Sequence, residues 1–175
     1  GMIVLPGLVN AHVHLWEIPL RGLGADWISH RDYHGTVHRN LAMHYTADDV
    51  YVANQLGALN QIHGGTTTVL DWCHVVRDAG MTDAAIDGLA ATGLRTRFAR
   101  GTSKPPPEAE SAARPYWETP YPREEILRLR KGRLASDDAR VTLAMATLGP
   151  DIATYEVARD EIRLAREFGL LHSAH

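Results

Sequence analysis

Leu8-Val9-Asn10-Ala11-His12-Val13-His14 is the stretch near the start of the chain from which the rest can be interpreted. Its Leu and Val residues favour a β-strand. Side chains two apart on a strand point to the same face, so the imidazoles of His12 and His14 would meet at one spot. Imidazole is a favoured ligand of zinc and of late first-row metals, which makes the pair a candidate metal chelate. On these residues alone, the alternative is that the two histidines are solvated or hydrogen-bonded side chains at a strand end.

Strand and helix patterns alternate along the rest of the chain. Runs of β-branched and apolar residues predict strands over 8–14, 66–72, 95–100, 141–148 and 170–175. Capping and periodicity predict helices from Thr46 to Gly64, from Thr82 to Gly93, from Pro122 as first helical residue, and over Tyr155–Phe168 after a Thr154 cap. Segment 16–45 is expected to be loop or short helix, and the proline-rich segment 101–121 a long loop.

Five strands separated by four helical segments indicate a parallel sheet with right-handed crossovers. From His14 to His175 the chain spans 175 − 14 = 161 residues in four β-α units, or about 40 each. That length suits a (β/α)8 barrel with loop insertions, but eight units would need well over about 250 residues. We therefore expect an α/β chain whose residues 1–175 form the N-terminal part of a TIM-type barrel. This incomplete domain has about five β-α units and is truncated at strand five.

The last predicted strand supplies a third histidine. Leu171, Ser173 and His175 share one face of that strand, whereas His172 points to the other. If His175 lies at the carboxyl end of its strand, as His14 does, both lie at the barrel mouth where active sites of this fold gather. The alternative is that His175 has no role.

Composition excludes several classes of protein. The chain has a net charge of −3 and no basic block, so nucleic acid is not an expected partner. No stretch is long and apolar enough to span a membrane, and no secretory signal is recognisable. The single cysteine, Cys73, rules out an intramolecular disulfide and fits a reducing cytoplasm.

The chain resembles the amidohydrolase superfamily, in its mononuclear-metal branch of cytosine, guanine and methylthioadenosine deaminases and s-triazine hydrolases. The matching segments occur in the family's order, at 6–14, 21–23, 46–51, 64–68, 148–150 and 171–175. The resemblance implies that strand one supplies His12 and His14 as metal ligands and that strand five supplies the third. That third ligand lies about six residues after a helix-ending glycine, and 175 − 169 = 6 selects His175. The family's remaining ligands and acid-base residues would lie beyond His175, so this chain alone is expected to be inactive.

The resemblance also implies the cofactor and the reaction. Strand 141–150 lacks the bridging Lys or Glu of binuclear members, so one divalent metal is expected, with zinc preferred to iron. The implied reaction is hydrolysis of a non-peptide C–N bond, namely deamination of an aminated heterocycle by a metal-supplied hydroxide. A cyclic amide or imidazolone hydrolase and a non-catalytic metal-binding remnant are the alternatives. The expected partner is a small heterocyclic substrate, and assembly into a homo-oligomer is a further possibility.

Four residues are candidate substrate contacts. Trp16 and Glu17 follow the histidine pair directly, Trp27 lies in the next loop, and His74 ends the second predicted strand. Aromatic rings could stack on a heterocycle and polar groups could hydrogen-bond to it. The alternatives are a packed Trp16 and a solvated Glu17. Residues 1–5 resemble the strand that leaves the small β-sandwich of the family, and the rest of that sandwich is missing.

Overall fold

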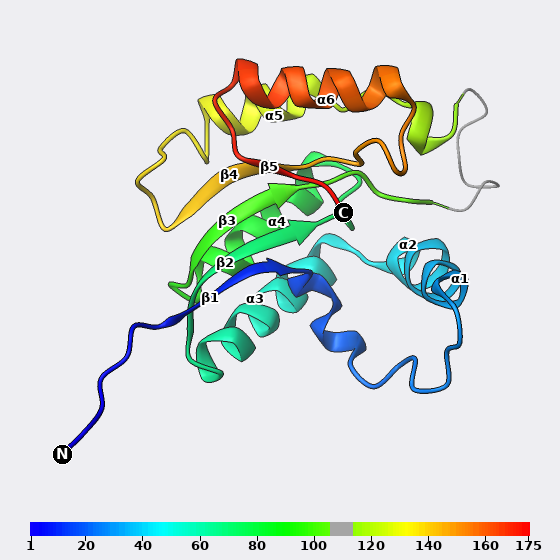
Figure 1. Ribbon diagram of the computed structural model, residues 1–175. Coiled ribbons are helices and arrows are strands. Elements are labelled where there is room, and N and C mark those ends of the chain that lie inside the picture. Colours follow the sequence, from blue (N-terminus) through cyan, green and yellow to red (C-terminus); the bar gives the residue numbers. More distant parts are fainter. Residues whose placement is uncertain (106–113) are drawn as a thin grey trace.

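The strands form one curved parallel sheet in the computed structural model, which describes residues 1–105 and 114–175 (Figure 1). Their order in the sheet follows their order in the chain. The strands are β1 (Leu8–Val13), β2 (Thr66–Cys73), β3 (Arg95–Arg100), β4 (Val141–Ala146) and β5 (His172–Ser173). The predicted partial barrel is therefore confirmed: right-handed parallel β-α units place the strands side by side in sequence order.

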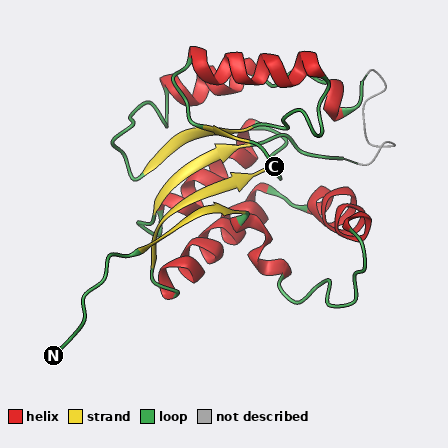
Figure 2. Cartoon of the chain, viewed as in Figure 1, coloured by secondary structure: helices red, strands yellow, loops and turns green. Residues whose placement is uncertain are grey.

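A helix covers the outer face of the sheet after each of the first four strands (Figure 2). The long helices are α3 (Ala47–His63), α4 (Ala79–Ala90), α5 (Arg123–Lys131) and α6 (Tyr155–Glu167). Between β1 and α3 the chain forms a 3₁₀ helix (Leu15–Leu20), α1 (His30–Tyr33), a π-helix (His34–Leu41) and α2 (Ala42–His44). The segment expected as loop or short helix is thus mostly short helix.

Several element boundaries differ from the sequence-based prediction. Helix α4 begins at Ala79 rather than at Thr82, because the Asp78 carboxylate accepts the backbone N–H of Met81 at 2.8 Å and caps the helix. Pro122 is the N-cap of α5, not its first helical residue. Strand β5 is shorter than 170–175, because only His172 and Ser173 pair with β4. The expected loop 101–121 contains a 3₁₀ turn (Tyr116–Glu118), and its residues 106–113 lie outside the described part.

The predicted helix start at Thr46 is confirmed. The Thr46 hydroxyl accepts the backbone N–H of Asp49, and the Asp49 carboxylate accepts the backbone N–H of Thr46 at 2.8 Å. This reciprocal capping box satisfies two backbone donors that a helix start leaves without partners.

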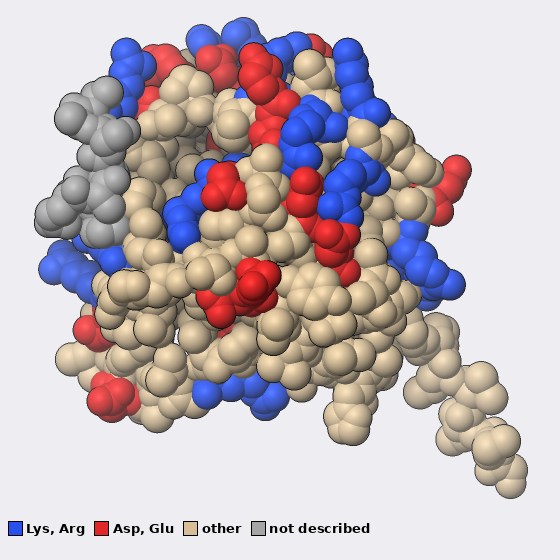
Figure 3. Space-filling view, turned by 180° about the vertical axis from the view of Figure 1, so that it is seen from behind, with Lys and Arg blue, Asp and Glu red and all other residues tan. Residues whose placement is uncertain are grey.

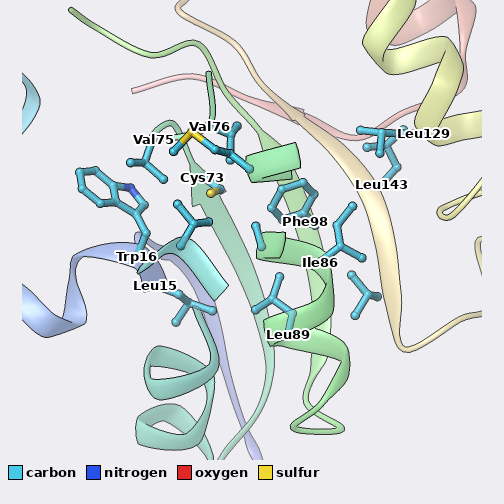
Figure 4. Close-up of a cluster of buried hydrophobic side chains, with 14 of the residues drawn as sticks. Leu15, Trp16, Cys73, Val75, Val76, Ile86, Leu89, Phe98, Leu129 and Leu143 are labelled. Atoms are coloured by element: carbon cyan, nitrogen blue, oxygen red, sulfur yellow. The ribbon is translucent and has the colours of Figure 1, made fainter. Parts of the chain in front are cut away.

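The two faces of the sheet carry different side chains. Toward the helices, Phe98 and Leu143 join the main buried cluster with Leu89 of α4 (Figure 4). Toward the barrel interior, Trp72 pairs in register with Ala99, and Ala99 with Ala144. Two small residues beside Trp72 leave room for its indole, so this ring lies inside the barrel below the carboxyl ends of the strands.

Acidic and basic side chains interleave on the face shown in Figure 3. Arg128 pairs with Asp83 at 3.0 Å, Arg123 with Glu167 at 2.5 Å, and Arg133 with Asp87. Such exposed pairs add little stability, but they keep positive charge from collecting in one patch. Within the described residues, none of the helices has both the length and the apolar character that crossing a membrane requires.

A buried carboxylate holds the turn after β4. Glu161 of α6 is 1% exposed, and its Oε2 accepts the backbone N–H of Leu148 at 3.0 Å. Its other oxygen, Oε1, has no partner among the described residues. Burial raises the pKa of Glu161 to about 7.

Replacing Glu161 by glutamine is expected to stabilise the protein at alkaline pH. The folded-state pKa lies above the ordinary 4.5, so the stability that Glu161 contributes is present below pH 4.5 and is lost as the pH rises through about 7. The stability of E161Q relative to wild type should therefore grow between pH 4.5 and 7, by at most about 3 kcal/mol. Chemical denaturation of the full-length protein at pH 5 and pH 8 measures this. Glu156→Gln, on the exposed side of the same helix, is the control, and equal shifts in both variants would contradict the prediction.

Candidate active site

Two neighbouring histidines, His12 and His14, meet the distant His175 at the carboxyl ends of the strands. The ring centroids of His12 and His14 lie 5.0 Å apart, and His175 lies 4.9 Å from the first and 5.3 Å from the second. One nitrogen from each ring can be chosen so that all three lie within 4.8 Å of one another. Figure 1 shows the C-terminus beside the ends of β1 to β3, which brings His175 to the histidines that follow β1.

The geometry of His14 and His175 suits a shared metal ion. Their Nε2 atoms are 3.3 Å apart. Two imidazole nitrogens bound to one tetrahedral zinc at about 2.1 Å would be separated by about 3.4 Å. Nδ1 of His14 lies 2.7 Å from the backbone oxygen of Trp72. A carbonyl can only accept, so Nδ1 carries the proton and Nε2 keeps the lone pair that a metal needs.

Partial burial keeps the imidazoles of His14 and His175 neutral. It lowers the pKa of His14 to about 4 and that of His175 to about 4, with smaller contributions from neighbouring positive groups. Neutral imidazole is the form that ligates metals, so near pH 7 no proton has to leave before binding.

A cavity of about 640 Å³ opens beside the three histidines. This volume lies in the range of small-molecule sites. The cavity is lined by His12, His14 and His175, together with Glu17, His74, Tyr33, Lys104, His30, His34, His38, Asp151 and Ile152.

A hydrogen-bonded chain forms one wall of this cavity. The Tyr33 hydroxyl donates to Glu17 Oε1 at 2.6 Å, and Nε2 of His38 lies 3.1 Å from the same hydroxyl oxygen. Burial raises the pKa of Glu17 to about 7, against the opposing effects of Tyr33 and Lys104. Burial also lowers the pKa of Lys104 to about 8. Both groups therefore change charge near neutrality, which is typical of functional sites.

The four candidate substrate contacts fall into two groups. Glu17 and His74 line the cavity, although His74 is only 1% exposed. Trp16 does not line it: the side chain is fully buried beside Leu15 in the main core, where its apolar ring gains more from packing than from exposure (Figure 4). Trp27 packs against Tyr33, with ring centroids 6.2 Å apart, and is also absent from the lining.

Sequence reasoning assigned no firm site role to His30, His34 and His38, and it missed Lys104 and Trp72. His30, His34 and His38 recur every four residues, and this spacing places them on one face of a helical segment. That periodicity was a readable signal. Lys104 lies in the proline-rich loop after β3 and carries no local pattern. Trp72 lies beside four site histidines, at 4.1 Å from His175, 5.0 Å from His74, 5.7 Å from His14 and 6.3 Å from His12, measured between ring centroids.

Solved structures share this fold. The triazine hydrolase from Arthrobacter aurescens aligns over 98% of this chain and 40% of its own, with a TM-score of 0.75 and 19% identity. A mutant atrazine chlorohydrolase from the same species, solved with zinc and atraton, aligns over the same shares with a TM-score of 0.72 and 20% identity. An amidohydrolase from a Sargasso Sea environmental sample aligns over 97% and 38%, with a TM-score of 0.69 and 22% identity.

Curated relatives and a family model agree in sequence. The 5-methylthioadenosine/S-adenosylhomocysteine deaminases of Bacillus cytotoxicus and Bacillus cereus are each 30% identical to this chain over 135 residues. That alignment covers 73% of this chain but only 30% of theirs, so the chain spans a minor part of their length. The model of the amidohydrolase family matches residues 3–175. The chain therefore belongs to the amidohydrolase family, and its parallel half-barrel and its converging histidines agree with that match.

Proposed function

We propose that the full-length protein is a metal-dependent hydrolase that deaminates an aminated heterocycle. The observation that carries the proposal is the convergence of His12, His14 and His175 beside a cavity of substrate size. The deaminase relatives support hydrolysis of a C–N bond, and the triazine hydrolase structures support a heterocyclic substrate. Residues 1–175 are the N-terminal part of the barrel in this proposal, and the unpaired thiol of Cys73 supports a cytoplasmic enzyme.

The three histidines would hold one divalent metal, with zinc preferred. Three imidazoles and the 3.3 Å spacing between Nε2 of His14 and Nε2 of His175 fit that ion. When bound, such a metal lowers the pKa of water toward neutrality and so supplies a nucleophile at the cavity.

The cavity residues of this chain would bind and orient the substrate. Glu17 can exchange a proton near pH 7 at its carboxylate, and Lys104 adds a buried cation that has no ion pair among the described residues. Trp16 and Trp27 would support the wall from behind rather than stack on the ring, because neither lines the cavity. The side chains of Glu17 and His74 are thus the proposed direct contacts.

Ammonia release tests the proposal. The full-length protein, stripped of metal and then reloaded with zinc, would be assayed with methylthioadenosine, guanine, cytosine and amino-s-triazines. We expect ammonia from at least one of them, dependent on zinc. Cyclic amides and imidazolones are assayed in parallel for ring opening. Hydrolysis of these alone would replace deamination by the cyclic-amide alternative, and zinc binding without any turnover would leave only a metal-binding protein.

A further inference from the structure

A second group of potential metal ligands lies next to the first. Glu17, His38 and His74 also offer ligand atoms within 4.8 Å of one another. His74 stacks on His14, with ring centroids 4.5 Å apart and planes inclined by 14°. The location of a histidine in the cavity therefore does not show whether it binds a metal or forms hydrogen bonds instead. The distinction comes from the partner that each imidazole has on its other nitrogen.

The indole of Trp16 fixes the proton of His74. Nε1 of Trp16 lies 2.9 Å from Nδ1 of His74. Indole N–H can only donate, so Nδ1 must be the acceptor and Nε2 must carry the proton. A doubly protonated ring would set two N–H groups against each other. His74 is therefore the opposite tautomer to His14, whose Nδ1 donates to the backbone oxygen of Trp72.

This assignment removes His74 from the possible metal ligands. Nδ1 is occupied by the indole, and Nε2 has no lone pair. His38 is committed as well, because the Tyr33 hydroxyl donates to Glu17 and can only accept from Nε2–H of His38 at 3.1 Å. The second group is thus a hydrogen-bonded network on the cavity wall rather than a second metal site.

We propose that His74 is a specificity-determining hydrogen-bond donor, and that Trp16 is the residue that positions it. Within the described residues, the structure shows one hydrogen bond for the His74 ring, the one from Trp16, so Nε2–H remains for a ligand. His74 lines the cavity, and packing against Trp72 and His38 holds its ring, with centroids 5.0 and 4.5 Å away.

The chemistry of the ligand follows from this donor. Nε2–H of His74 would recognise a heterocycle with an unprotonated ring nitrogen or a carbonyl oxygen near the reacting carbon. It would disfavour a heterocycle that presents an N–H at that position. A site built to donate a hydrogen bond rejects an analogue that lacks the acceptor, because a buried donor is left without a partner. The substrate class in this inference rests on the proposed function, whereas the tautomer of His74 does not depend on it.

The tautomer can be measured without turnover. Ring-¹⁵N-histidine labelling of the zinc-loaded full-length protein separates protonated from unprotonated ring nitrogens by chemical shift, and His74→Gln identifies the His74 signals. We expect Nε2 protonated and Nδ1 unprotonated, with the Nδ1 signal shifted in Trp16→Phe as the indole bond is lost. Protonated Nδ1, or a second equivalent of zinc that disappears in His74→Gln, would overturn the inference.

Specificity is tested with methylthioadenosine and its 1-, 3- and 7-deaza analogues, in which CH replaces one ring nitrogen. His74→Leu should lower kcat/KM for the parent by about 10- to 100-fold and leave one analogue unaffected. His74→Gln, which keeps an N–H near the position of Nε2, should recover part of the loss, and zinc content should not change. Equal losses for all four compounds would contradict a donor role. If wild type releases no ammonia but shows the expected tautomer, the proposed function fails and the tautomer assignment stands.

Discussion

Replacing His175 by alanine is expected to abolish zinc binding at micromolar metal and to remove hydrolytic activity. His175 provides one of the three imidazoles of the proposed metal site, and its Nε2 lies 3.3 Å from that of His14. Loss of an outer-shell partner of a metal ligand typically costs 10- to 100-fold in affinity, so loss of the ligand itself should cost more than about 100-fold. Zinc titration of the full-length variant, with ammonia release as the second readout, measures both effects.

His172→Ala is the matched control for this variant. His172 lies three residues before His175, in β5, pairs with Met145 of β4, and does not line the cavity. Its zinc affinity should equal that of wild type. If both variants lost zinc to the same extent, the loss would reflect damage to β5 rather than removal of a ligand, and the assignment of His175 would fail.

Replacing Gly88 by alanine is expected to lower the stability of the protein markedly. A Cβ at Gly88 would lie 2.4 Å from the backbone oxygen of Tyr51 and 3.2 Å from the backbone nitrogen of Gln55, both in α3. Backbone atoms cannot turn aside as a side chain can, so α3 and α4 would have to separate. Overpacking of this kind costs about 1–3 kcal/mol or more, which outweighs the gain of up to about 1 kcal/mol in helix propensity.

Gly35→Ala tests whether this cost comes from packing. Gly35 is also helical, but an added Cβ would meet no atom within 4 Å. This variant should be as stable as wild type or more stable by up to about 1 kcal/mol. The midpoint of urea denaturation of the full-length protein compares the two. If the urea midpoint of Gly88→Ala were at or above that of Gly35→Ala, the contact between α3 and α4 would tolerate a Cβ at Gly88, and the prediction would be wrong.

Local sequence signals predicted the elements well where those signals are local in origin. The capping box at Thr46 depends on residues three apart, and strand Arg95–Arg100 on its own composition, so both are found where expected. The predicted start of α4 was wrong because Asp78 and Thr82 both suit a cap. Only the folded backbone shows that Asp78 is the cap, accepting the N–H of Met81. Strand β5 was predicted too long because pairing requires a neighbour, and β4 meets it only at His172 and Ser173.

The sequence by itself determined the alternation of strands and helices, and with it the parity that puts His12 and His14 on one face and separates His175 from His172. Both features follow from the side-chain periods of 2 residues in strands and 3.6 residues in helices, which can be recognised in the sequence alone. Only the tertiary structure decided what lies opposite each face. It buried Trp16 and made its indole the partner of His74, and it brought Lys104 and the His30–His34–His38 series to the same cavity. Distances between residues far apart in the chain, and the proton positions that depend on them, arise only when the sheet curves and packs.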